Sequence, residues 1–104
     1  MENIIRGTTP TLIVDFTGVL DVSTITDAVL TIRTRAGITE KMLSDLTVDT
    51  EHKTVSYHFT QAETLALTAK DTVSFQLDVV VAGERTVCLM ESTRVKETQY
   101  PREL

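Results

Sequence analysis

The chain is poor in the residues that cross-linking and recognition of flat ligands require. Its 104 residues include one cysteine, Cys88, which has no partner for an internal disulfide, so stability must come from packing. Tryptophan is absent and aromatic residues make up 5% of the chain, which argues against a surface that stacks bases or sugars. Ten basic against fifteen acidic residues give a net charge of −5. Because phosphate binding needs clustered lysine and arginine, we expect no nucleic-acid partner.

Long hydrophobic runs are also missing. No apolar stretch is long enough to span a bilayer, and the N-terminus does not read as a secretory signal peptide, so we expect no membrane partner and synthesis in the cytoplasm. A length of 104 residues and a hydrophobic content of 41% fit one folded domain with a modest core. We therefore expect a single domain over residues 1–104, with a short N-terminal arm (1–6) and a C-terminal tail (97–104).

The clearest pattern lies in Thr72–Val81. Val73, Phe75, Leu77 and Val79 alternate with mostly polar residues, and a period of two is typical of a half-buried strand. This is the most hydrophobic strand of the chain, so we expect it at the centre of a sheet. Just upstream, Thr60 is followed three residues later by a glutamate, the spacing of a capping box, which predicts a short helix beginning at Thr60.

Similar alternation and abundant β-branched threonine and valine predict the other strands. They are expected at 11–16, 28–35, 38–43, 47–49, 55–59, 85–91 and 93–96. Ala36-Gly37 and Ala82-Gly83 are expected to turn two hairpins. The pattern predicts an all-β fold, an antiparallel immunoglobulin-like β-sandwich with one short helix between strands; a small barrel is the alternative.

Candidate chemical groups are few. His58 lies between two aromatic residues that we expect to face inward, so it is expected to face solvent. His52 follows Glu51 and lies near Asp49, but this spacing matches no known metal-binding loop and favours a solvated hairpin tip. Cys88 has no basic neighbour that would activate a thiolate, which favours a small buried core residue. We therefore expect no enzyme activity and no catalytic, cofactor-binding or metal-binding residues.

Several short motifs resemble those of known proteins. They are Ile4–Leu12 (IIRGTTPTL), Thr60–Leu65 (TQAETL), Phe75–Leu77 (FQL), Gly83 and Val95. Together they resemble a set of small proteins of Gram-positive phages and prophages, which are similar to the N-terminal immunoglobulin-like domain of phage baseplate upper proteins. The resemblance implies a virion structural protein with no catalytic residues. It also implies an accessory module rather than a complete adhesin, because no fibre or receptor-binding part follows the tail.

We therefore expect a non-enzymatic phage virion component associated with the tail, baseplate or capsid, made in the bacterial host cytoplasm and located in the virion. Its expected partners are other virion proteins, contacted in multiple copies, and its expected attachment segments are Glu2–Arg6 and Thr98–Leu104. The alternative is a soluble carbohydrate- or cell-surface-binding module. Sugar binding favours exposed aromatic side chains, and Tyr57 is expected to face inward.

Overall fold

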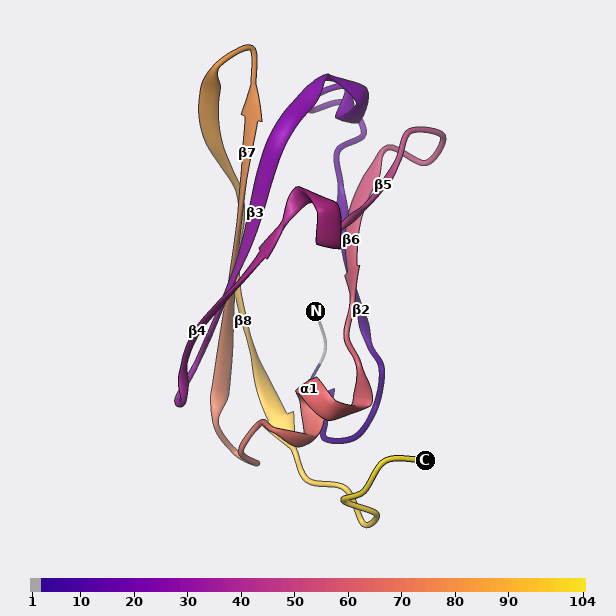
Figure 1. Cartoon of the computed structure of the whole chain (residues 1–104), viewed down its shortest axis with the longest axis vertical. Helices are drawn as coiled ribbons and strands as arrows, with labels where there is room; N and C mark the ends of the chain where they lie inside the picture. The colour runs from indigo at the N-terminus through magenta and orange to yellow at the C-terminus, as the bar shows by residue number, and fades with distance from the viewer. Residues whose placement is uncertain (1–2) are drawn as a thin grey trace.

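The computed structural model describes residues 3–104, which form two β-sheets that face each other across one hydrophobic core (Figure 1). The five-stranded sheet has the order β1-β8-β7-β3-β4 and the three-stranded sheet the order β2-β6-β5. Their bounds are β1 Ile4–Ile5, β2 Thr11–Asp15, β3 Ile25–Thr34, β4 Gly37–Met42, β5 Thr47–Asp49, β6 Thr54–His58, β7 Thr72–Val81 and β8 Glu84–Lys96. The α-helix α1 spans Gln61–Leu65, and two 3-10 turns span Val22–Thr24 and Leu43–Asp45. The expectation of a β-rich domain with two sheets and one short α-helix is confirmed.

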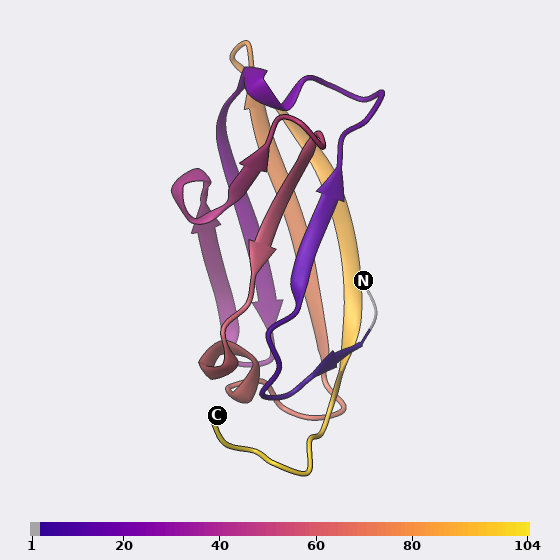
Figure 2. The ribbon, with the colours of Figure 1, turned by 90° about the vertical axis from the view of Figure 1, so that its right-hand side faces the viewer.

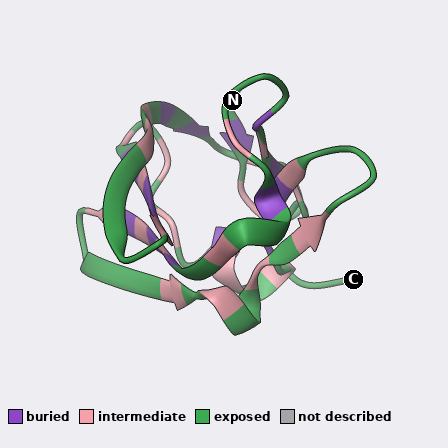
Figure 3. Ribbon diagram, turned by 90° about the horizontal axis from the view of Figure 1, so that it is seen from above, coloured by how far each residue is buried: buried purple, intermediate pink, exposed green. Residues whose placement is uncertain are grey.

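The predicted central strand is the middle strand of the larger sheet. β7 lies between β8 and β3, and Val73, Phe75, Leu77 and Val79 are each at most 2% exposed. Tyr57 of β6 and Phe59, which directly follows this strand, contribute two rings that meet edge to face, and the ring of Phe59 packs in the same manner on that of Phe75. Burial therefore follows the period-two pattern, and the buried positions lie along the inner faces of both sheets (Figure 3).

The helix α1 begins where the capping box predicts. The Thr60 hydroxyl accepts a hydrogen bond from the backbone N–H of Glu63, and the Glu63 carboxylate accepts one from the backbone N–H of Thr60. The helix lies at the lower end of the two sheets in Figure 1. Thr64 is fully buried there and donates to the carbonyl of Thr8 at 2.7 Å. The helix therefore joins the N-terminal segment to this end of the core.

Three expectations about strands are wrong. Residues 85–91 and 93–96 are not two strands but parts of one, β8, because Ser92 between them pairs in register with Ser74 of β7. A bulge at Cys88 shifts the pairing with β7 further along the same strand. Strand β3 begins at Ile25, three residues earlier than expected, because its pairing with β7 continues past an irregularity near Asp27. The sheets are not wholly antiparallel, since β1 runs parallel to β8.

The N-terminal arm is not free over its described part. Ile4 is 1% exposed and belongs to the core, and Arg6 donates to the carboxylate of Glu97 at 2.7 and 2.9 Å and to the carbonyl of Leu65 at 2.9 Å. The expectation of a free arm is therefore wrong for Ile4–Arg6, whereas its role in attachment stays a prediction. Glu2 lies outside the described residues. Residues 98–104 are largely exposed and run beneath the lower end of the domain (Figure 2).

Candidate functional site

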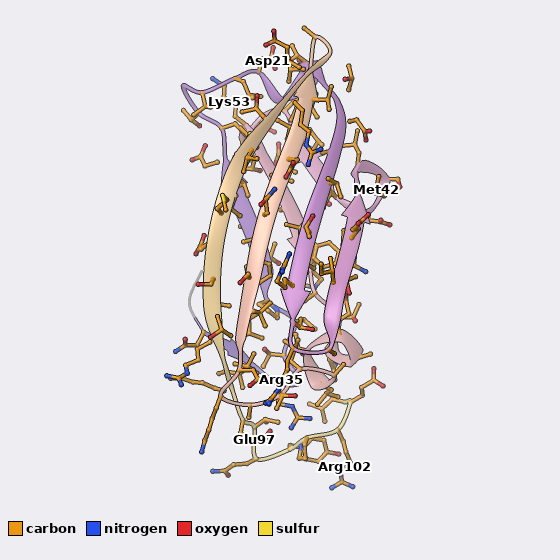
Figure 4. The ribbon with its side chains drawn as sticks, turned by 90° about the vertical axis from the view of Figure 1, so that its left-hand side faces the viewer. Asp21, Arg35, Met42, Lys53, Glu97 and Arg102 are labelled. Atoms are coloured by element: carbon orange, nitrogen blue, oxygen red, sulfur yellow. The ribbon has the colours of Figure 1, made fainter. Side chains whose placement is uncertain are left out.

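The candidate site is the outward-facing side of the five-stranded sheet, which faces the viewer in Figure 4. We call it the outer sheet face. It comprises Val29, Thr31, Ile38, Glu40, Met42, Gln76, Asp78, Val80, Arg85, Val87 and Met90. On β3 and β7 these residues alternate with core residues, and those on β4 and β8 lie opposite outward-facing residues of β3 and β7 in the strand pairing, so all of these side chains point outward.

A buried carboxylate lies on the outer sheet face, toward the turn between β7 and β8. Asp78 is only 3% exposed although it points away from the core. Gln76 donates its amide to Oδ1 of Asp78 at 2.9 Å, and Arg85 donates from Nε to Oδ2 at 2.6 Å. The hydrogen bond from Gln76 lowers the pKa of Asp78, burial opposes this, and Arg85 lowers the pKa further. Asp78 is therefore an ionised carboxylate with a hydrogen bond to each oxygen, and it has a structural role rather than that of a candidate general acid.

Exposed apolar side chains share the outer sheet face with this carboxylate. The side chains are 75% exposed at Met90, 55% at Ile38, 46% at Val87 and 45% at Met42. Two open grooves, of about 450 and 360 Å³, cross the same face, and both include Thr31 in their lining. A sheet face with several exposed apolar residues and a fixed polar group is typical of a surface that contacts another protein.

The edge of the sheet next to this face is open. One side of β8 pairs with β7. On its other side, β1 is the only strand among the described residues that pairs with β8, and it does so only at Val95 and Lys96. Glu84–Met90 therefore presents backbone N–H and C=O groups with no described neighbouring strand, and an edge of this kind can accept a further strand. The outer sheet face and this edge form one continuous region.

Cys88 occupies the bulge of β8 and is partly buried against the core, rather than fully buried as expected. Burial raises the pKa of the Cys88 thiol, and the negative charge of Asp78 raises it further. The thiol is therefore neutral at physiological pH, and nothing about its surroundings activates it as a nucleophile.

The two histidines lie at opposite ends of the β5–β6 region. His52 sits in the turn that joins β5 to β6, where its Nδ1 lies 2.7 Å from Oδ2 of Asp49. The same carboxylate also accepts the backbone N–H groups of Glu51 and His52, and the His52 N–H is the main reason that the pKa of Asp49 is lowered. His58 is exposed, with Nδ1 2.7 Å from the hydroxyl of Thr11.

The structure does not bring these histidines together, and among residues 3–104 no group of three His, Cys, Asp or Glu side chains is placed to hold a metal ion. In the same range, no helix is long and apolar enough to cross a bilayer.

Two polar clusters were missed at the level of sequence. The Asp78–Arg85 pair joins residues on either side of the Ala82-Gly83 turn, and the charge of Asp78 between Leu77 and Val79 is the pattern that points to it. The second cluster joins Lys41, Tyr57 and Glu63, and only the folded chain brings these three together.

No protein-family model matches the chain, and no curated protein matches it. What bears on function is therefore the surface chemistry of the domain together with the short motifs described above.

Proposed function

We propose that this protein is a non-enzymatic structural component of a phage particle, an immunoglobulin-like β-sandwich that works through protein–protein contacts. The observation that carries the proposal is the outer sheet face with its open β8 edge. Met90 and Val87 are exposed beside an edge that can accept a strand, so this region offers both apolar area and backbone hydrogen bonds to a partner. The resemblance to small phage proteins supplies the expected setting, the virion.

The size of the domain limits how tightly a single contact can hold it. A stable interface commonly buries about 800 Å² on each partner, which is a large share of the surface of so small a domain. Attachment to a particle would therefore use several contacts at once, so that each strengthens the others. The exposed segment Thr98–Leu104 remains part of the proposal as a second attachment site.

A carbohydrate-binding role has less support from the surface. Four of the five aromatic residues are buried, and Tyr100, at 47% exposure, is the one that solvent reaches freely. Its ring lies 5.0 Å from the guanidinium carbon of Arg102. One exposed ring is fewer than the aromatic side chains that commonly stack on sugars at a binding surface. A glycan array tests the carbohydrate-binding alternative directly.

The test is mass spectrometry of purified particles from the source phage or prophage. We expect the protein among the virion proteins, in several copies per particle. Its absence from mature particles in which capsid and tail proteins are found would show that the proposal is wrong.

A matched pair of variants then tests the contact region. Val87→Lys combined with Met90→Lys should reduce the copy number per particle, because it places two charges on the proposed contact. Ile13→Lys, on the outer face of the other sheet at a side chain 62% exposed, should leave the copy number unchanged. Both variants should unfold at similar denaturant concentrations to the parent protein, and equal losses from the two would contradict the choice of the outer sheet face.

A further inference from the structure

The charged residues of this domain are divided between the two ends of its long axis. We define the upper end as the segments 15–27, 49–54 and 78–85, and the lower end as the segments 6–10, 33–36, 59–71 and 94–104. The strands run between these ends, so turns distant in sequence meet at each of them (Figure 1). Figure 4 shows Asp21 and Lys53 at the upper end, with Arg35, Glu97 and Arg102 at the lower end.

The two ends carry opposite net charge. The upper end holds seven Asp and Glu residues against two basic residues, Lys53 and Arg85, a net side-chain charge of −5. The lower end holds seven Lys and Arg residues against four Asp and Glu residues, a net charge of +3. The overall charge of −5 therefore conceals a basic end.

A neighbouring molecule interacts electrostatically with each end of the domain separately. The domain is 45 Å long, whereas charges at physiological ionic strength are screened over about 8 Å. A contact at the basic end is thus governed by the local charge of that end and not by the net charge of the chain. The same holds at the acidic end, so that two copies which repel each other side by side can still attract end to end.

Each end also offers charged side chains to a second copy. A groove of about 570 Å³ reaches the lower end, and its lining includes Arg94 and Lys96 but no carboxylate. At the upper end, Glu51 is exposed in the turn between β5 and β6, and Glu84 is exposed at the start of β8. Neither carboxylate makes a side-chain hydrogen bond or ion pair with any residue in the range 3–104.

Each end adds an exposed apolar group. Val19 is 70% exposed in the upper turn that follows β2, and Leu104 is 96% exposed in the tail at the lower end. An end-to-end contact would therefore bring together apolar side chains as well as opposite charges.

We propose that copies of this chain dock head to tail, with the acidic upper end of one copy against the basic lower end of the next. This inference rests on the proposed structural role of the protein. It specifies one partner for that role, a second copy of the same chain. Such a contact uses two different surfaces, so it leaves a free end on each side and allows a row or a ring of copies. The Cα trace is only 26 by 21 Å in cross-section, so a flat end-on contact is smaller than the roughly 800 Å² per partner of a standard interface. Such a contact is weak and depends on salt.

Sedimentation equilibrium of the purified protein tests the salt dependence. At about 20 mM NaCl the weight-average mass should rise with concentration to more than twice the monomer mass of 11.5 kDa, and at about 500 mM it should return to the monomer value. A mass that stays at the monomer value at both salt concentrations would overturn the inference.

Two variants with one altered end each test the orientation. Glu51→Lys with Glu84→Lys weakens the upper end and keeps the lower end, whereas Lys96→Glu with Arg102→Glu weakens the lower end and keeps the upper end. Each variant alone should be monomeric at low salt. Their equimolar mixture should form dimers and nothing larger, because one intact acidic end then meets one intact basic end.

A control variant separates the effect of charge at one end of the domain from the effect of overall net charge. Ile13→Lys with Glu40→Lys and Thr47→Lys changes the net charge by the same amount as the upper-end variant, but at exposed positions midway along the strands. It should associate like the parent protein. A mixture of the two end variants that remains monomeric would overturn the head-to-tail contact even if particles contain the protein, so this failure is distinct from a failure of the proposed function.

Discussion

The hydroxyl of Tyr57 donates a hydrogen bond to Oε2 of Glu63 at 2.5 Å. Through this bond a core residue of β6 holds the same carboxylate that completes the capping box of α1. Lys41 of β4 lies 3.2 Å from that oxygen and 5.3 Å from the centre of the Tyr57 ring. One carboxylate therefore links both sheets and the helix, where the capping box by itself explains only the start of the helix.

Loss of the Tyr57 hydroxyl should destabilise the domain. We expect Tyr57→Phe to lower the free energy of unfolding by about 1–2 kcal/mol, because a hydrogen bond to an ionised group is removed while the ring stays packed. Urea denaturation measures this change. Tyr57→Phe in a Glu63→Gln background should cost less than in the parent protein, and equal costs in the two backgrounds would show that the two residues are not coupled.

Acid should weaken the same link. Burial raises the pKa of Glu63, but hydrogen bonds from Tyr57, the Thr60 N–H and Lys41 outweigh it, and the pKa lies below the ordinary value of 4.5. A lowered folded-state pKa gives stability that is present above the unfolded value and lost as the pH falls through the folded value. The difference in unfolding free energy between the parent protein and Glu63→Gln should therefore shrink between about pH 6 and pH 3. A constant difference over that interval would contradict the conclusion that the lowered pKa of Glu63 contributes to stability.

The core of β7 should dominate stability. Phe75 is 2% exposed, and we expect Phe75→Ala to cost about 3–5 kcal/mol through lost burial and a cavity. Thr60→Ala should cost about 1 kcal/mol, because it removes only the helix cap. Ile13→Ala, at an exposed position, should change stability by less than about 0.5 kcal/mol. Chemical denaturation of the three variants gives their order, and a near-neutral Phe75→Ala would contradict the packing.

The turn between β7 and β8 contains a residue in an unfavourable conformation. Ala82 has φ of 53° and Gly83 has φ of 79°, and both values lie in the left-handed region that two-residue hairpin turns require. Asparagine tolerates this region better than alanine, so Ala82→Asn should raise the free energy of unfolding by up to about 1 kcal/mol. Ala36→Asn, in the turn between β3 and β4 where the alanine has no positive φ, should give no comparable gain. Thermal unfolding of the two variants measures this difference, and equal effects of the two substitutions would contradict the role given to the φ of Ala82.

The sequence alone predicted the features that depend on neighbours close in the chain. The alternation of Thr72–Val81 identified the central strand and its buried face, because side chains of a strand point to opposite sides at every step. The capping box located α1 to the residue, since both of its hydrogen bonds join groups three positions apart. Ala82-Gly83 likewise located the hairpin turn, because glycine there meets a local backbone requirement.

Only the tertiary structure decided the features that depend on which segments meet. The pairing of Ser92 with Ser74 makes β8 one long strand, and the core position of Ile4 turns an expected free arm into part of a sheet. Burial of Asp78 requires Arg85 to reach back across the hairpin, and the acidic and basic ends exist only because turns distant in sequence come together when the strands pair. A period of two determines which way a side chain points, but it carries no information about the strand, charge or end of the molecule that the side chain will meet.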